Sequence, residues 1–181
     1  MRKIWAFGGI PGTGKTTLMN RIINDFATDW KPGAPAPLCN GIYSESLDTW
    51  VLGKYAPFYE LEGYAQGTDK LSMAVQPEAI KFVKETKSNI IFEGDRLFTA
   101  SFLEECEAQN VDFKIFILTA DNIQERYEQR GSSQSEKFIQ GRKTKIDNIA
   151  KNFVLWDYIV EYQHNIESDT TFIVNDLRRS L

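Results

Sequence analysis

Residues 9–16 read Gly-Ile-Pro-Gly-Thr-Gly-Lys-Thr, a complete match to the phosphate-binding loop pattern G-x-x-x-x-G-K-[ST]. The loop follows an apolar run at residues 4–7 and precedes a helical pattern in which Leu18, Ile22 and Phe26 recur every four residues. A strand, a glycine-rich turn and a helix N-terminus together direct backbone N–H groups at phosphate oxygens. The stretch therefore predicts a nucleoside triphosphate site at the start of an α/β domain.

The parts of this loop have separate expected roles. Lys15 is expected to reach the β- and γ-phosphates, and the hydroxyl of Thr16 is expected to ligate Mg²⁺. The residues predicted to bind the triphosphate are Gly12, Thr13, Gly14, Lys15, Thr16 and Thr17. The expected cofactors are therefore ATP and Mg²⁺.

Further apolar runs alternate with helical patterns along the chain. They predict strands at residues 38–43, 90–92, 113–118 and 172–174, and helices starting near Pro77, Thr99, Asp121 and Glu136. The helix from Asp121 is expected to end at Gly131. The last helix is expected to bury one face, formed by Ile146, Ile149, Phe153 and Trp156. Residues 31–37, which hold three of the six prolines, are expected to form a loop.

Strands that alternate with helices imply βαβ units and a parallel sheet. The expected fold is therefore the P-loop NTPase fold, a three-layer α/β/α sandwich with a mainly parallel five-stranded sheet and a helical lid. With 181 residues and no linker, the chain is expected to form a single domain over residues 1–181.

Composition narrows the classes of function. A net charge of −4 at pH 7 gives the surface as a whole no attraction for nucleic acid. Cys39 and Cys106 form no metal-binding or redox pattern, and the only histidine, His164, is remote from the loop in sequence. No apolar run approaches the roughly 20 residues of a membrane span, and the first strand starts too early for a signal peptide. We expect a cytoplasmic protein with no membrane partner.

A second candidate segment, Glu93-Gly94-Asp95-Arg96, follows the strand expected at residues 90–92. Because ligands bind at the carboxyl ends of parallel strands, this turn is expected to lie beside the phosphate-binding loop. Asp95 is the candidate catalytic residue and metal ligand. Glu93 is expected to bind substrate, and it is also the alternative for both roles of Asp95. Arg96 is expected to bind a substrate phosphate through two hydrogen bonds. The alternative interpretation is an exposed acidic turn with a surface ion pair.

A basic segment lies at residues 126–151, where seven basic residues stand against three acidic ones, a net charge of +4. Arg126 and Arg130 lie four residues apart on one helix face, and Arg142 follows a polar break at residues 132–135. Arginines on both sides of a break are typical of a lid that closes over a triphosphate. We expect such a lid over residues 126–145, with Arg126 and Arg130 catalytic and Arg142 binding substrate. A solvated basic helix face is the alternative.

Residues 44–76 mix polar and aromatic side chains and are expected to form a substrate-binding insertion rather than core. Aromatic residues gather in or beside it: Tyr43, Trp50, Tyr55, Phe58, Tyr59 and Tyr64. Aromatic rings stack on nucleobases, but packing against the domain is the better interpretation for most of these. Asp69 is a candidate to contact the acceptor or to remove a proton from it.

The phosphate-binding loop, the Glu-Gly-Asp-Arg turn and the arginine-flanked break together resemble the nucleotide and nucleoside kinases. In that superfamily an Asp-Arg pair commonly closes a strand, and a helix ending Arg-x-x-x-Arg-Gly leads into a mobile lid. Here the matching residues are Asp95-Arg96 and residues 126–131. The resemblance covers most of the chain.

A narrower resemblance concerns bacteriophage kinases that act on 5-hydroxymethyluracil in DNA. The similar segments are Gly-Thr-Asp-Lys-Leu-Ser-Met-Ala-Val-Gln-Pro at 67–77, Phe-Glu-Gly-Asp-Arg-Leu-Phe at 92–98 and Lys-Phe-Ile-Gln-Gly-Arg-Lys-Thr-Lys at 137–145. This resemblance implies phosphorylation of the hydroxymethyl group on the base, with Asp95 or Asp69 beside it and residues 44–76 holding the base. It also implies a location in the host cytoplasm.

Three hypotheses follow. The leading one is an ATP/Mg²⁺-dependent kinase acting on 5-hydroxymethyluracil in DNA. The second is a kinase of free nucleosides or deoxynucleoside monophosphates, which the length and the negative charge favour. The third is a nucleotide-dependent switch ATPase, which would hydrolyse ATP without phosphorylating an acceptor.

Overall fold

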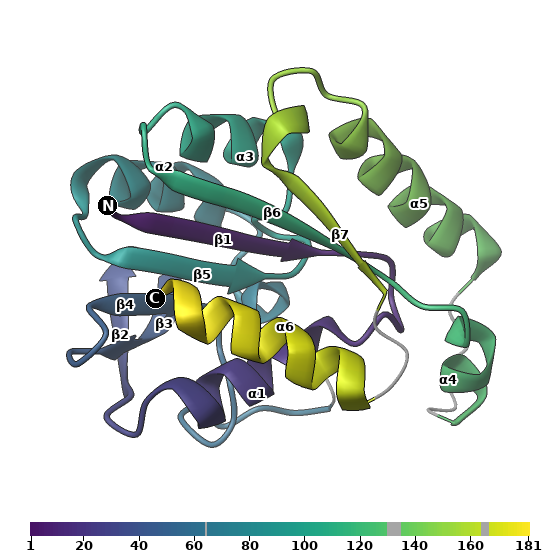
Figure 1. Cartoon of the computed structure of the whole chain (residues 1–181), viewed down its shortest axis with the longest axis horizontal. Helices are drawn as coiled ribbons and strands as arrows, with labels where there is room; N and C mark the ends of the chain where they lie inside the picture. Colours follow the sequence, from purple (N-terminus) through teal and green to yellow (C-terminus); the bar gives the residue numbers. More distant parts are fainter. Residues whose placement is uncertain (64, 130–134, 164–166) are drawn as a thin grey trace.

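The computed structural model describes residues 1–63, 65–129, 135–163 and 167–181, and its centre is a seven-stranded sheet (Figure 1). The strand order is β2-β3-β4-β5-β1-β6-β7. The strands are β1 (Lys3–Gly8), β2 (Lys31–Ala36), β3 (Cys39–Ser44), β4 (Thr49–Leu52), β5 (Asn89–Glu93), β6 (Asp112–Thr119) and β7 (Ile159–Gln163). Strands β4, β5, β1, β6 and β7 run parallel, and β2 and β3 extend the sheet as an antiparallel hairpin.

Helices cover both faces of this sheet. They are α1 (Lys15–Phe26), α2 (Val75–Glu85), α3 (Ala100–Glu107), α4 (Ile123–Gln129), α5 (Glu136–Ala150) and α6 (Glu167–Ser180), with short 3-10 helices η1 (Thr68–Lys70) and η2 (Trp156–Tyr158). Helices α1 and α6 lie on one face, and α2, α3 and α5 lie on the other (Figure 1). The predicted three-layer α/β/α sandwich is confirmed, with seven strands rather than five.

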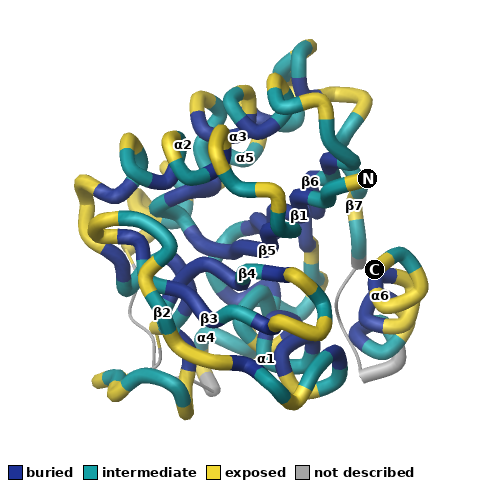
Figure 2. The backbone as a smooth tube through the Cα atoms, turned by 90° about the vertical axis from the view of Figure 1, so that its left-hand side faces the viewer, coloured by how far each residue is buried: buried dark blue, intermediate teal, exposed yellow. Residues whose placement is uncertain are grey.

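Two apolar cores hold the layers together. Leu18 and Ile22 of α1 pack with Ile173 and Leu177 of α6 against one side of the sheet, and all four are buried. The second core lies under α2, α3 and α5. Figure 2 shows the strands as a buried layer between helices whose outer sides are exposed. The rigid sheet between the two cores fixes the positions of the loops at its ends.

Neighbouring strands place the two candidate segments side by side. In the parallel pair β1 and β5, Phe7 is opposite Glu93. The phosphate-binding loop therefore leaves β1 next to the point where the Glu-Gly-Asp-Arg turn leaves β5. Helix α4 also lies at this carboxyl edge of the sheet (Figure 1). The expected position of this turn beside the phosphate-binding loop is thus confirmed.

Two predictions in the first half of the chain are wrong. Residues 31–36 form the strand β2 rather than a loop, because β2 is an edge strand and proline there loses only a hydrogen bond that would point to solvent. Within the expected insertion at residues 44–76, residues 49–52 form the buried strand β4, which pairs with β5. Tyr55 is also fully buried. This part of the segment is core, whereas a role in substrate binding for the rest stays a prediction.

Two predictions near the C-terminus are also wrong. Residues 172–174 lie in α6 rather than in a strand, and the edge strand is β7 instead. A short apolar run fits a buried strand and a helix face equally well, so periodicity could not decide between them. Helix α5 ends at Ala150, which leaves Phe153 86% and Trp156 72% exposed, whereas Ile149 is buried as expected.

Other local predictions are confirmed. Thr99 caps α3, since its side chain accepts a hydrogen bond from the N–H of Phe102, and Leu103 and Cys106 are buried. Both cysteines are free thiols. Tyr64, Arg130, Gly131 and His164 lie outside the described residues, as do residues 132–134 of the expected break.

Candidate active site

Glycines bend the phosphate-binding loop into the start of α1. Gly12 and Gly14 have φ of 84° and 87°, values that favour glycine, and Gly14 directly precedes the helix. The loop thus opens onto a helix N-terminus, which is an arrangement that binds phosphate. Lys15 begins the helix, and its Nζ donates to the carbonyl oxygens of Gly9 (2.9 Å) and Ile10 (3.2 Å). These contacts hold the ammonium group against the loop.

Thr16 and Glu93 bring a hydroxyl and a carboxylate together beside this loop. Thr16 Oγ1 donates to Glu93 Oε1 at 3.4 Å. Glu93 ends β5 and is only 1% exposed. Burial raises the pKa of Glu93 to about 8, against the opposing effect of the positive charge on Lys15. A buried carboxylate beside a hydroxyl fits Mg²⁺, because the cation stabilises the ionised carboxylate.

The segment leading into η1 encloses Glu93 from the other side. Thr68 Oγ1 donates to the main-chain oxygen of Glu93 at 2.8 Å. A Cβ atom on Gly67 would overlap the Glu93 carboxylate, and the φ of Gly67 is 73°. The hydroxyl of Tyr55 is buried near Gly67 and has no hydrogen-bond partner within the described residues. Burial raises the pKa of Tyr55 well above its usual value. Glu93 is therefore shielded from water on this side.

Two further carboxylates, Asp69 and Asp95, meet at the turn after β5. The main-chain N–H of Asp95 donates to Asp69 Oδ1 at 2.7 Å. Burial raises the pKa of Asp69, and the negative charge of Asp95 raises it further. In the same turn, Nε of Arg96 is buried without a hydrogen-bond partner in the described parts of the chain. A carboxylate of raised basicity in η1 thus contacts a turn that carries a cationic donor.

Two basic side chains of α5 hold Asp95. Arg142 Nη1 lies 3.1 Å from Asp95 Oδ2, and Lys145 Nζ lies 3.6 Å from Oδ1. Lys145 also donates to the main-chain oxygen of Asp95 at 3.0 Å. Burial lowers the pKa of Lys145, an effect that the charge of Asp95 opposes. Sequence reasoning had not singled out Lys145, although its spacing of three from Arg142 puts both side chains on one helix face.

Helix α4 rests on the phosphate-binding loop. Arg126 Nη1 donates to the main-chain oxygen of Gly12 at 3.0 Å. The hydroxyl of Tyr127 donates to the main-chain oxygen of Pro11 at 2.7 Å. A Cβ atom on Gly12 would lie 3.0 Å from the Tyr127 ring, so the helix packs closely on the loop. Arg126 therefore contacts the phosphate-binding loop, and its catalytic role stays a prediction. Arg130 lies outside the described residues.

Two other residues predicted to bind the triphosphate differ in burial. Thr13 is buried and donates from Oγ1 to the main-chain oxygen of Ile10 at 2.9 Å, whereas Thr17 is exposed on α1. In the parts of the chain that the structure describes, no three acidic, histidine or cysteine side chains form a ready-made metal site.

The comparison with known families agrees with this geometry. The sequence model of the family described as P-loop Nucleotide Kinase3 matches residues 1–163. The chain belongs to this family. In this P-loop nucleotide kinase, the matched range includes the loop, the acidic turn, α4 and α5. No curated protein matches the chain. Among the described helices, none has the length and apolar character needed to cross a bilayer.

Family membership assigns the coarse activity. A P-loop nucleotide kinase binds a nucleoside triphosphate and is a phosphotransferase, with ATP and Mg²⁺ as the usual cofactor pair. Lys15, Thr16 and Glu93 lie together beside the phosphate-binding loop. Asp69 and the Asp95-Arg96 turn lie next to Glu93 on the same edge of the sheet.

Proposed function

We propose that this protein transfers the γ-phosphoryl group of ATP to the hydroxymethyl group of 5-hydroxymethyluracil in DNA. The observation that carries the proposal is the contact of Asp69 with the Asp95 turn beside the phosphate-binding loop. Asp69 and Asp95 belong to two of the three segments that resemble the phage kinases, and they meet although they lie 26 residues apart.

The donor half of the site consists of Lys15, Thr16 and Glu93. Lys15 neutralises charge on the β- and γ-phosphates, which is the main requirement of phosphoryl transfer. Thr16 and Glu93 are the residues that would hold Mg²⁺, because their oxygens lie 3.4 Å apart. When bound, the metal neutralises developing charge on the phosphates. Glu93 replaces Asp95 in this role, because Asp95 is held in ion pairs by α5.

The acceptor half consists of Asp69, Asp95 and Arg96. Asp69 has a pKa raised by burial and by Asp95, so it is a stronger base than an exposed carboxylate. It takes the proton of the hydroxymethyl O–H while the oxygen attacks the γ-phosphorus, and the bond from the γ-phosphorus to the bridging oxygen breaks to release ADP. Asp95, fixed by Arg142 and Lys145, positions Asp69 through its main-chain N–H. Arg96 supplies a cationic donor near the acceptor.

The test is transfer of radiolabelled γ-phosphate with Mg²⁺ to four acceptors. These are DNA containing 5-hydroxymethyluracil, unmodified DNA, free nucleosides and free monophosphates. Label on the modified DNA alone, absent with the Lys15→Ala variant, supports the proposal. Label on free nucleotide with none on modified DNA refutes it.

A second candidate is phosphorylation of a free nucleoside or nucleoside monophosphate. It is favoured by the net charge of −4 and by the pairing of Arg142 and Lys145 with Asp95, which partly neutralises the cations beside the site. The donor half and the phosphoryl transfer step are the same in both candidates. Saturation by a free acceptor distinguishes the second candidate from the first in the same assay.

A further inference from the structure

We propose that the cleft between the N-terminus of α3 and helix α5 binds a phosphate of the acceptor nucleotide and the sugar that carries it. This inference rests on the proposed function and extends it, because it assigns the acceptor phosphate to a cleft that forms where α3 and α5 come together. The chemistry named is a nucleotide phosphate, which either a DNA strand or a free monophosphate supplies.

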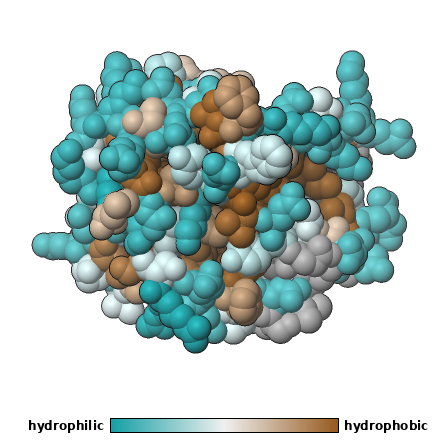
Figure 3. Space-filling model, turned by 45° about the horizontal axis from the view of Figure 1, so that its top comes forward, coloured by the Kyte–Doolittle hydropathy of each residue, from teal (hydrophilic) through white to brown (hydrophobic). Residues whose placement is uncertain are grey.

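The cleft is a cavity of about 430 Å³ beside the acidic turn. Such a volume is within the usual range for small-ligand sites. It is lined by Thr99, Ala100, Ser101, Gly141, Thr144, Lys145, Asn148 and Ile149. Figure 3 shows hydrophobic surface recessed between hydrophilic side chains on the face that carries α3 and α5. A sugar fits the apolar floor of such a cleft, and a phosphate fits its polar rim.

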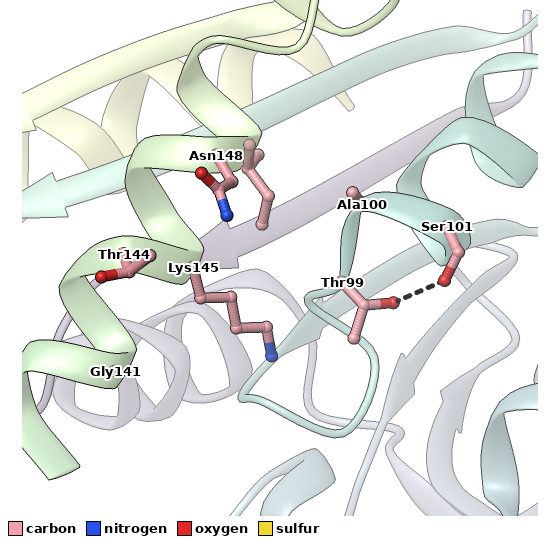
Figure 4. A pocket seen from close by; sticks show the side chains of 8 residues that line it. Thr99, Ala100, Ser101, Gly141, Thr144, Lys145 and Asn148 are labelled. Carbon is pink, nitrogen blue, oxygen red and sulfur yellow. Dashed lines mark hydrogen bonds between the residues drawn. The ribbon is translucent and has the colours of Figure 1, made fainter.

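The lining carries one positive charge and no carboxylate. Lys145 extends from α5 toward Thr99 on the opposite wall, and the Asn148 amide also points into the space (Figure 4). The Asn148 side chain makes no hydrogen bond within the described residues, although both its N–H bonds can donate. An ammonium group and an amide facing the same space suit an anion bearing several acceptor oxygens.

The α3 wall adds further donors. Ser101 Oγ accepts a hydrogen bond from Gln76 Nε2 at 2.8 Å, which leaves its own hydrogen to donate to Thr99 or to a ligand. Thr99 caps α3, and the first N–H groups of a helix have no partner within it. Their dipole also favours an anion. Both walls of the cleft thus present donors.

Lys145 connects this cleft to the proposed reaction centre. Its Nζ lines the cavity and also donates to the main-chain oxygen of Asp95 at 3.0 Å. The turn from Gly94 to Phe98, closed by a hydrogen bond of 3.0 Å between Phe98 N and Gly94 O, leads directly from Asp95 to Thr99. Lys145 therefore links the two sites. A phosphate bound at its ammonium group would lie close to the Asp95 turn, which in turn contacts Asp69.

The decisive variant is Asn148→Asp, which puts a negative charge into the cleft at an exposed helical position without changing side-chain size. The matched control is Asn110→Asp, the same change in the exposed turn after α3. We expect Asn148→Asp to raise the KM for a phosphorylated acceptor about tenfold through charge repulsion. The KM for ATP is expected to be unchanged. Ser101→Ala, which removes one donor, is expected to have a smaller effect in the same direction.

The acceptors distinguish the two sources of phosphate. An effect on a 5-hydroxymethyluracil oligonucleotide identifies a strand phosphate, and an effect on the free 5′-monophosphate identifies a mononucleotide. Equal KM values for Asn148→Asp and Asn110→Asp overturn the cleft assignment while leaving the kinase activity established.

Calorimetric titration with dTMP and with a thymidine oligonucleotide gives a readout that needs no catalysis. Binding weakened by Asn148→Asp supports the cleft even if no acceptor is phosphorylated, which would refute the proposed function alone. Absence of binding to both ligands by the unaltered protein overturns the cleft assignment.

Discussion

Replacing Glu93 with glutamine is expected to stabilise the protein in the absence of nucleotide and magnesium. Glu93 has a folded-state pKa of about 8 because of burial, against 4.5 for the exposed group. Between these values the unfolded chain has released the proton that the folded chain retains. Stability therefore falls as pH rises, by about 1.4 kcal/mol per pH unit for this one group. Above pH 8 both states are ionised and the loss levels off.

Glutamine is nearly the same size and carries no ionisable proton, so Glu93→Gln removes this penalty. Integration from the unfolded pKa gives a gain of about 3 kcal/mol at pH 7 and less than about 1 kcal/mol at pH 5. For a chain of this size each kcal/mol shifts Tm by roughly 2–4 °C, so the expected shift at pH 7 is roughly 6–12 °C.

The measurement is thermal and urea unfolding of both proteins at several pH values between 5 and 8, with EDTA present. The pH 5 comparison is an internal control for any change in packing, since Glu93 is protonated there in the folded protein. A stability difference that stays constant across this pH range would refute the reasoning. It would show that water or a local rearrangement compensates the charge of Glu93. The same variant is expected to lose phosphoryl transfer, so stability and activity change in opposite directions.

Three further predictions concern the reaction centre. Lys15→Ala is expected to reduce phosphoryl transfer at least about a thousandfold by removing charge from the phosphates, measured as single-turnover transfer; a loss under tenfold would contradict that role. Asp69→Asn is expected to lower kcat about a hundredfold or more in steady-state kinetics, with the KM for ATP unchanged. Asp95→Asn is expected to lower kcat by a smaller factor. A larger loss of kcat in Asp95→Asn than in Asp69→Asn would assign the base to Asp95. Tyr127→Phe removes the hydrogen bond to Pro11 and is expected to cost about 1 kcal/mol and to raise the KM for ATP. Urea unfolding with ATP titration checks this, and an unchanged Cm would contradict it.

The sequence predicted the central βαβ architecture because its signals there are local. The phosphate-binding loop needs glycine at fixed positions, and the buried strands β1, β5 and β6 each contain an apolar run of three or more residues. The edges of the sheet were harder, because an edge strand buries less and tolerates proline, as β2 does. The prediction of a strand near the C-terminus was wrong for a related reason. Residues 172–174 are apolar in a row, but Ile173 and Leu177 face the core at helical spacing.

The sequence predicted most of the segments that meet at the site, but not which side chains contact one another. That Thr16 faces Glu93 rather than Asp95 depends on the register of β1 against β5, which no local pattern specifies. Lys145 could be identified as a basic helical residue, but its contact with Asp95 requires α5 to cross the end of β5. Roles that depend on contacts distant in sequence therefore had to wait for the fold.

Three carboxylates crowd this edge of the sheet, and each is stabilised differently. Glu93 is buried and favours its protonated form, Asp69 accepts a hydrogen bond from the main chain, and Asp95 pairs with two cations of α5. Without these arrangements, mutual repulsion would destabilise the folded chain.

The same arrangements also place the carboxylates at different parts of the site. Glu93, the carboxylate that gains most from a cation, lies beside the phosphate-binding loop. Asp69, whose pKa is raised by burial and by Asp95, lies on the proposed acceptor side. Because α5 neutralises Asp95 and still presents Lys145 to the cleft, a protein of net charge −4 can attract a nucleotide phosphate locally. Binding of acceptor phosphate should therefore be sensitive to single charges in this cleft and insensitive to charges elsewhere on the surface.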